Sequence, residues 1–268
     1  MPSPARPLFE VEDLRVTFGD PGAPIAAVAG ASLSLGRERV GIVGESGSGK
    51  STLGRALLGL APPGARVSAR RLVFDGIDLL AAPPATRRAL LGRRMSLVMQ
   101  DPRQALNPVM RIGDQIAEGL RVGDPALSRA AAARAAVDAL AEVRIREPAR
   151  VARLYPHEIS GGMGQRAMIA MMLAPGPNFL VADEMTSALD PTTRLQVLAI
   201  LDDLVAGRGM GLLFIAHDLD LVASFCDRVV VMEAGRLVEE CAARDLHAAR
   251  HPTTRRLLSS RPGPRPSP

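Results

Sequence analysis

The residues from Gly44 to Ser51 have the types and the spacing needed to hold a phosphate chain. They fit the pattern GxxxxGK[ST] and read Gly44, Glu45, Ser46, Gly47, Ser48, Gly49, Lys50 and Ser51. Glycines let successive backbone N–H groups point at phosphate oxygens, and a helix that starts here adds its positive end. We expect Lys50 to reach the β- and γ-phosphates of ATP, and Ser51 to bind Mg²⁺, with Thr52 beside it in the nucleotide site. An ordinary turn rich in Gly and Ser is the alternative.

Lys50 is the only lysine among the 33 Lys and Arg residues of the chain. A compact ammonium on a flexible stem reaches between phosphate oxygens as a point charge, which a planar guanidinium does not. Chance retention of one lysine would give the same count. The count therefore supports phosphate binding by Lys50 but does not establish it by itself.

Two adjacent carboxylates, Asp183 and Glu184, follow the apolar run from Phe179 to Ala182. A carboxylate at the end of a parallel strand lies where ligands bind in an open α/β sheet. We expect Asp183 to hold Mg²⁺ and Glu184 to polarise an attacking water. Read alone, the run is equally typical of a buried strand before a solvated acidic turn, and the phosphate loop favours the catalytic interpretation.

The elements that must position these residues alternate between strands and helices. The phosphate loop is expected to lie between a strand at 39–43 and a helix at 51–60. Further strands are predicted at 8–18, 72–74, 95–99, 179–182, 211–216 and 228–232. From Asp101 to Tyr155 helical spacing dominates, as in Ile112, Ile116 and Leu120. The sequence therefore predicts an α/β core interrupted by a helical insert.

Composition narrows the class of protein. Apolar residues make up 47% of 268 residues, and the net charge of +5 does not by itself indicate nucleic acid. Cys226 and Cys241 form no CxxC pair, which suits a reducing compartment. Neither a signal peptide nor a membrane-spanning run is evident, so we expect any membrane role to be peripheral.

A third motif, Ile159 to Arg166, reads Ile-Ser-Gly-Gly-Met-Gly-Gln-Arg and opens a helical stretch. Here the chain resembles the ATP-binding-cassette (ABC) ATPases, which carry an LSGGQ-like signature just before the aspartate strand. The resemblance implies that the signature binds the γ-phosphate of ATP held by a second ATPase subunit. The residues concerned are Ser160, Gly161, Gly162 and Met163. A Ser-Gly-Gly turn at a helix N-terminus is by its physics an anion site, although it is also a plain helix cap.

Other family elements occur in the expected order. Gln100 matches the Q-loop glutamine that binds Mg²⁺ and couples to a membrane partner, and His217 matches the switch histidine that contacts the γ-phosphate. Phe18 matches the aromatic residue that stacks on adenine, and Asp190 ends a D-loop of sequence Ser-Ala-Leu-Asp. With Lys50 and Glu184, His217 completes the implied catalytic set. Without the resemblance, a structural histidine and a core phenylalanine would be the ordinary interpretations.

The implied fold is α/β: a P-loop NTPase (RecA-like) core with ABC antiparallel β elements and an inserted α-helical subdomain. One ABC ATPase domain is expected at 8–260. Its nucleotide-binding core is placed at 8–100 and 160–240, its helical signature subdomain at 101–159, and a C-terminal helical segment with a Pro-rich tail at 241–268.

Three segments are similar to those of one branch of the family. Ser-Gly-Gly-Met followed by Gln165 and Arg166, together with Gln-Asp-Pro at 100–102 and His-Pro-Thr-Thr-Arg at 251–255, resembles the first ATPase of the peptide/nickel importers. Two residues depart from the usual family pattern: Met163 stands where the signature usually has Gln, and Met185 replaces the proline that usually follows the catalytic glutamate. The absence of a longer tail with clustered cysteines favours nickel or metallophore import over di- or oligopeptide import.

The resemblance also implies partners and a location. They are a second ABC ATPase in a heterodimer, two membrane permeases and an extracytoplasmic solute-binding protein, at the cytoplasmic face of the inner membrane, with no nucleic acid. The alternatives are a soluble ABC ATPase acting on nucleic acid or ribosomes, and another P-loop enzyme such as a kinase. A single cassette with a short insert argues against the first, and the Ser-Gly-Gly turn before Asp183 argues against the second.

Overall fold

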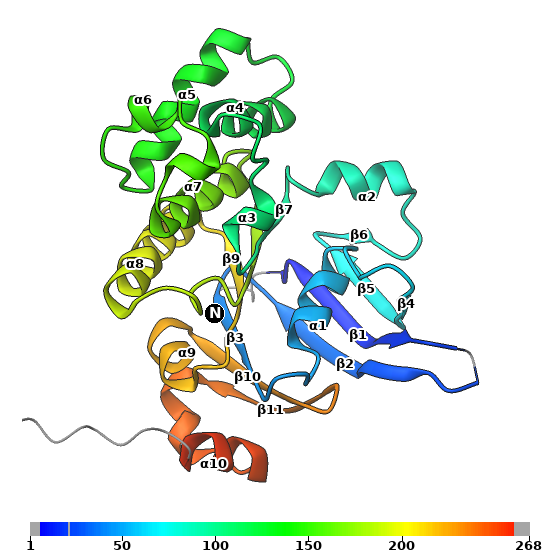
Figure 1. Ribbon diagram of the computed structural model, residues 1–268. Coiled ribbons are helices and arrows are strands. Elements are labelled where there is room, and N and C mark those ends of the chain that lie inside the picture. The colour runs from blue at the N-terminus through cyan, green and yellow to red at the C-terminus, as the bar shows by residue number, and fades with distance from the viewer. Residues whose placement is uncertain (1–5, 21, 260–268) are drawn as a thin grey trace, which may run out of the picture. The chain divides into compact units, whose positions relative to one another are not determined.

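The structure is a computed structural model that describes residues 6–20 and 22–259 (Figure 1). The chain forms two compact units, one from residues 1–81 with 213–268 and the other from residues 82–212. The predicted boundaries of the helical subdomain at 101 and 159 stay predictions. The predicted Pro-rich tail from Arg261 lies outside the described residues.

The first unit holds an antiparallel sheet with strand order β2-β1-β5-β6, in which β4 also pairs with β1. Its strands are β1 (Phe9–Phe18), β2 (Ile25–Leu35), β4 (Arg66–Ser68), β5 (Arg71–Phe74) and β6 (Ile77–Asp78). Alternate residues of β1 are buried, with Phe9 against Phe74 of β5 at 4.7 Å between ring centroids. The period of two is what a half-buried strand requires.

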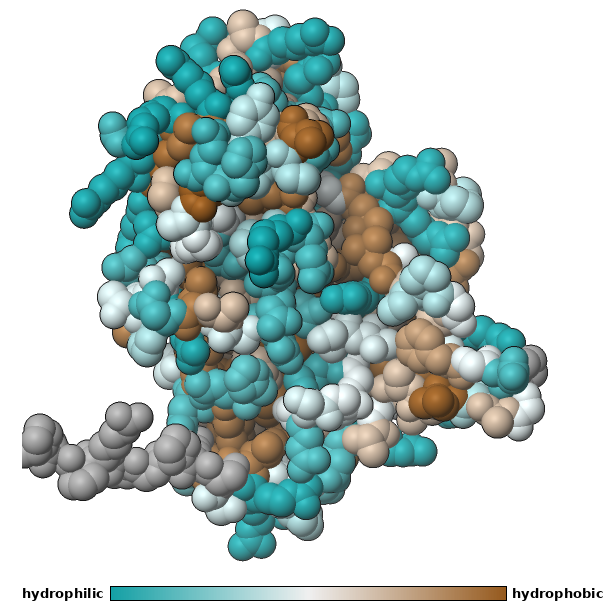
Figure 2. Space-filling model, viewed as in Figure 1, coloured by the Kyte–Doolittle hydropathy of each residue, from teal (hydrophilic) through white to brown (hydrophobic). Residues whose placement is uncertain are grey.

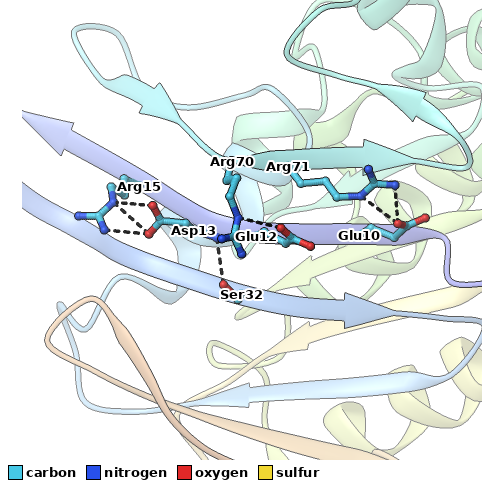
Figure 3. A network of polar contacts seen from close by, with 7 residues as sticks. All are labelled: Glu10, Glu12, Asp13, Arg15, Ser32, Arg70 and Arg71. Carbon is cyan, nitrogen blue, oxygen red and sulfur yellow. Dashed lines mark hydrogen bonds and ion pairs between the residues drawn. The ribbon is translucent and has the colours of Figure 1, made fainter.

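Four residues of β1, Glu10, Glu12, Asp13 and Arg15, carry charges, and Glu10 and Glu12 pair across the sheet (Figure 3). Glu10 bonds Arg71 at 2.6 Å and Glu12 bonds Arg70 at 2.9 Å. Between Val11 and Leu14 the register with β2 shifts, and there Asp13 adopts a left-handed backbone with φ 51°. The outer face of β1 is therefore a ladder of exposed ion pairs, each of which contributes little to stability.

The first unit also holds β3, β10 and β11, in the sheet order β11-β10-β3. The bounds are Arg39–Val43 for β3, Arg228–Glu233 for β10 and Arg236–Ala242 for β11. Strand β3 runs parallel to β10, whereas β11 returns antiparallel to it. Four of the five residues of β3 are buried, as its continuous apolar sequence predicts.

Helices of the first unit follow these strands. They are α1 (Lys50–Leu57), α9 (Leu219–Phe225), the 3₁₀ helix η2 (Ala243–Ala248) and α10 (Pro252–Ser259). Arg39 at the start of β3 pairs with Asp227 at 2.9 Å, and the guanidinium holds the pKa of this carboxyl below its usual range. Arg228, the first residue of β10, pairs with Glu38 and Glu240. These charges join the starts of β3 and β10 to the last residues of β11.

The second unit contains the parallel pair β7 (Met95–Val98) and β8 (Phe179–Asp183), whose register places Val98 opposite Ala182. Its helices α4 to α7 lie together in Figure 1, and α7 contacts α4 and α5. Their bounds are α2 (Pro84–Leu90), α3 (Pro102–Ala105), α4 (Ile112–Gly123), α5 (Arg129–Glu142), α6 (Pro148–Val151), η1 (Pro156–Glu158), α7 (Gly161–Leu173) and α8 (Pro191–Arg208). Strand β9 (Gly211–Ile215) carries the chain from the second unit into the first.

Arginines tie α8 to the other helices of the second unit. Arg208, the last residue of α8, donates to the carbonyl oxygen of Leu173 at 2.7 Å and pairs with Glu142 of α5, also at 2.7 Å. Arg144 pairs with Asp203 of α8. Because a helix end leaves its last carbonyls without helical partners, Arg208 also serves as a cap for α7.

The predicted strands occur within a residue of their expected bounds, but four strands of the described part of the chain were not predicted. They are β2, which is one of the longest strands, and the strands β4, β6 and β11. The helix after the phosphate loop ends at Leu57 and not at Leu60, because Gly59 takes a positive φ of 70° and turns the chain.

Within residues 6–20 and 22–259, no helix combines the length and the apolar character needed to cross a bilayer. Figure 2 shows hydrophilic residues over much of the visible face of α4–α6, with apolar residues scattered between them.

Gly41 offers a test of the packing beneath β3. A Cβ at this position would lie 2.1 Å from Val222 Cγ1 and 3.0 Å from Cys226 Sγ, both on buried side chains. We expect Gly41→Ala to lower the free energy of unfolding by about 1–3 kcal/mol, because the added methyl group would overpack a core whose side chains have no room to move. Urea unfolding followed by circular dichroism measures the change.

Gly207→Ala is the matched control, since Gly207 lies in α8 and nothing stands within 4 Å of an added Cβ. It should leave stability unchanged or raise it by about 0.5–1 kcal/mol through the better helix propensity of Ala. Equal unfolding midpoints for Gly41→Ala and wild type would show that Val222 of α9 does not pack against Gly41 of β3.

Candidate nucleotide site

The loop between β3 and α1 folds around the ammonium group of Lys50. This side chain is only 4% exposed, and its Nζ donates to the carbonyl oxygens of Gly44 at 2.9 Å and Glu45 at 2.8 Å. Gly44, Gly47 and Gly49 have φ values of 157°, 79° and 103°. Left-handed backbone of this kind is costly for residues with a Cβ, so the loop's path depends on its glycines.

Backbone of the neighbouring strands closes on this loop from outside. A Cβ on Gly44 would lie 2.1 Å from the carbonyl oxygen of Met232, and one on Gly49 would lie 2.1 Å from that of Ala27. Gly235, in the turn between β10 and β11, donates its N–H to the carbonyl of Ser48 at 3.0 Å. The conformation of the loop is therefore fixed by β2 and by the β10–β11 turn as well as by its own sequence.

Helix α1 starts directly after the loop, and no side chain caps its N-terminus at Gly49. Ser51 and Thr52, in the first turn, are half-buried. Such a start, preceded by a turn rich in glycine, presents backbone N–H groups and the positive end of the helix dipole to an anion. Together with the Lys50 ammonium, this donor set fits the phosphates of a nucleotide.

The loop's acidic residue, Glu45, is held from the C-terminal end of the chain. Arg256 of α10 lies 3.2 Å from Glu45 and 3.0 Å from Glu233 at the end of β10. Sequence analysis did not identify this contact, because neither the spacing nor the type of Arg256 indicates a partner some two hundred positions away. It joins α10 to the rim of the phosphate loop.

Two other predicted residues lie in the first unit. Phe18 is the last residue of β1, is half-buried and stands opposite Ile25 in the register with β2. His217 is exposed and follows β9, and the N–H of Ala216 just before it donates to the Ile42 carbonyl of β3 at 3.1 Å. The end of β9 is thus anchored beside β3, the strand that leads into the phosphate loop.

The two carboxylates stand at the end of β8 in the second unit. All five residues of β8 are buried, and Asp183, the last of them, is 4% exposed. Glu184 is half-buried and has a left-handed backbone, with φ 47°, while Met185 after it is 1% exposed. Backbone strain at a non-glycine residue is concentrated at functional positions.

Gln100 is joined to this turn by hydrogen bonds. Its Nε2 donates to Ser187 Oγ at 2.9 Å, and Ser187 Oγ donates to the Glu184 carbonyl at 2.9 Å. Gln100 follows β7 and Ser187 follows β8, so the carboxyl ends of two paired strands meet at one edge of the sheet. Ser187 is the first residue of the predicted D-loop, and no role was predicted for it.

The predicted signature forms the start of α7. Ser160 is the N-cap residue, and its Oγ accepts from Met163 N at 3.4 Å. Gly161 is exposed with open space around an added Cβ, whereas a Cβ on Gly162 would lie 3.1 Å from Thr193 of α8. Asp190 caps α8 by accepting from Thr193 N at 3.0 Å, and Thr193 holds the pKa of this carboxyl below its usual range.

A hollow of about 920 Å³ in the second unit brings three of the predicted elements together. Its walls come from the segment after β7, the start of α7 and the D-loop, and they include Gln100, Asp101, Ser160, Gly161, Met185 and Leu189. The predicted residues therefore fall into two sets, one in each unit. Phe18, the phosphate loop and His217 belong to the first, and Gln100, the signature, the carboxylates and Asp190 belong to the second.

The chain has clear relatives. The sequence model of the family described as ABC transporter matches residues 29–187. The dipeptide transport ATP-binding protein DppD of Escherichia coli is 43% identical over 257 residues, covering 95% of this chain and 78% of that protein. The oligopeptide transport ATP-binding protein OppD of Salmonella typhimurium is 41% identical over 263 residues, covering 97% and 78%. In the dimeric structure of MJ0796, a bacterial ABC transporter cassette, the match has a TM-score of 0.78 at 25% identity, over 88% of this chain and 99% of that one.

Proposed function

Because this chain belongs to the ABC transporter family, we propose that it is the ATP-binding and ATP-hydrolysing motor subunit of an importer of dipeptides or oligopeptides. Both relatives described above carry dipeptide or oligopeptide transport in their names. The expected preference for nickel or metallophores rested on the short C-terminal segment and gains no support from them. The fold is that of an ABC ATPase, as predicted.

The observation that carries the proposal is the loop folded around Lys50. A buried ammonium that neighbouring carbonyls already orient needs little rearrangement to bind the β- and γ-phosphates of ATP. The amides of Gly47 and Gly49 and the start of α1 supply further donors. Phe18, at the end of β1, supplies an aromatic face for the adenine.

Hydrolysis is assigned to the turn after β8 and to His217. Glu184 polarises the attacking water and accepts its proton as the γ-phosphate is transferred, and His217 contacts that phosphate. Ser51, Asp183 and Gln100 offer hydroxyl, carboxylate and amide oxygens, the hard donor set that Mg²⁺ prefers, and so fit this ion. When bound, Mg²⁺ would offset the negative charge that develops on the phosphate oxygens.

The signature at Ser160–Met163 is assigned to the ATP of a second subunit. In this arrangement two ATPases meet head to tail, and each nucleotide lies between one phosphate loop and the other chain's signature. A heterodimer with a related ATPase, two membrane permeases and an external solute-binding protein complete the proposed complex. The chain then acts at the cytoplasmic face of the membrane as a peripheral subunit.

Lys50→Ala tests nucleotide binding. We expect it to lose most of the affinity for ATP or most of the hydrolysis, because the phosphates lose their point-charge partner. Equilibrium binding of a fluorescent ATP analogue and phosphate release measure both. In wild type, an acylating ATP probe should label Lys50 and otherwise only the N-terminal amine, with protection by excess ATP. Wild-type turnover in Lys50→Ala would rule out the phosphate loop.

Glu184→Gln tests the general base. The variant removes the group that accepts the proton of the attacking water and leaves Asp183 in place, so chemistry should slow by a factor of about 10²–10⁴ while ATP binding persists. Gel filtration with ATP should then show a trapped ATPase dimer. A variant that fails to bind ATP would assign Glu184 a structural or metal-binding role.

Ser160→Arg tests the head-to-tail arrangement. A bulky side chain at the glycine-lined start of α7 should leave nucleotide binding to this chain nearly intact and block the partner's site. The measurement is hydrolysis by mixed complexes that carry Ser160→Arg on this chain alone, with Glu184→Gln on this chain, or the matching change of the partner's own glutamate, to report each site separately. Loss of this chain's own site with a normal partner site would contradict the arrangement.

A further inference from the structure

We propose that Ser187 is a positioning residue that selects which atom of the Gln100 amide is available to a divalent cation in the nucleotide site. The inference rests on the proposed function, in which Gln100 is a Mg²⁺ ligand. It goes beyond that function because it assigns a task to Ser187, and the task follows from counting protons along a short chain of hydrogen bonds.

The chain of hydrogen bonds has a fixed direction. A carbonyl oxygen only accepts, so the Glu184 carbonyl, 2.9 Å from Ser187 Oγ, takes the single proton of the Ser187 hydroxyl. The Oγ atom then has only lone pairs left to offer Gln100. Gln100 must present its Nε2, which lies 2.9 Å away, since its Oε1 in that place would set lone pair against lone pair.

The consequence falls on the other end of the amide. With Nε2 engaged by Ser187, Oε1 is the atom that remains to act as a ligand, and an amide ligates Mg²⁺ through oxygen. Without Ser187 the Gln100 side chain loses the bond that holds this orientation, so conformers that present the nitrogen or turn away from the cation compete with the ligating one. Ser187 thus acts on the cation through Gln100, as an outer residue that orients an inner ligand.

The same serine also braces the turn that carries the catalytic carboxylate. Its backbone N–H donates to the Glu184 carbonyl at 3.1 Å, so this oxygen accepts two bonds from one residue. Glu184 has the left-handed φ of 47°, which needs support from its surroundings. A change in Gln100 is therefore transmitted through one hydroxyl to the backbone of the proposed general base.

The test measures Mn²⁺ affinity directly, by electron paramagnetic resonance of Mn²⁺ titrated into the full chain saturated with ATP. We expect Ser187→Ala to weaken Mn²⁺ binding roughly three- to tenfold, the effect of one lost orienting hydrogen bond. Binding of ATP in the presence of chelator should stay within about twofold of wild type. Ser187→Thr keeps the hydroxyl and should restore Mn²⁺ binding.

Gln100 supplies the control that separates positioning from general damage. Once Gln100→Ala has removed the ligand, adding Ser187→Ala should weaken Mn²⁺ binding no further, because the serine acts only through the amide. Ser187→Cys, whose thiol accepts weakly, should reproduce most of the effect of Ser187→Ala if the alanine variant does not fold.

Four results would overturn the inference. Unchanged Mn²⁺ affinity in Ser187→Ala, or additive losses in the double variant, would remove the link through Gln100. Unchanged affinity in Gln100→Ala would show that Gln100 is not a ligand, while ATP binding that depends on Lys50 would leave the proposed function standing. A wild-type chain that binds no ATP would overturn that function and this inference with it.

Discussion

The burial of one positive charge, the ammonium of Lys50, constrains the geometry of the site more than any other feature. A charged group taken out of water is costly unless dipoles or counter-charges surround it. Here two carbonyls of the preceding loop point at Nζ, which forces the chain between Gly44 and Lys50 to curl around the side chain. A carbonyl oxygen solvates an ammonium without cancelling its charge, and a phosphate does both. The loop is thereby shaped for an anion before one arrives.

This constraint reaches into strands that carry no chemistry of their own. The curled loop needs glycines at positive φ, and at Gly44 and Gly49 the space that a side chain would take is occupied by backbone from β10 and β2. The carbonyl oxygens of Ala27 and Met232 therefore shape the loop directly. The β10–β11 turn adds the bond from Gly235 to Ser48, and α10 adds Arg256 at the rim. Much of the first unit can thus be understood as support for one loop.

How far the sequence predicts this arrangement depends on whether the signal is local. Strand β3 is a short apolar run that leads into the loop before Lys50, and β8 is an apolar run that ends at Asp183. The strands and the positions of these two functional residues therefore follow from the sequence pattern. Strand β2 was missed because it is rich in Ala, Gly and Ser, and it is a strand only because β1 pairs with it. The contacts of Ser187 and Arg256 link residues 87 and more than 200 positions apart, and no local pattern records them. Position 185 holds Met in place of the expected proline, yet Glu184 before it still has a left-handed backbone.

The two glycine-rich helix starts differ in a way that suits their proposed tasks. Helix α1 has no side-chain cap at Gly49, so an anion there displaces no capping side chain. Helix α7 is capped by Ser160, through a contact of 3.4 Å that is near the long limit for a hydrogen bond, and its first residues are exposed. A phosphate that accepts from the amides at the start of α7 replaces this weak neutral bond with a charge-assisted one. The net gain in binding free energy is favourable but small, since the cap is lost. A site that must close and open in each cycle needs such a margin, because a signature that bound phosphate as firmly as the Lys50 loop does would hold the two subunits together after hydrolysis.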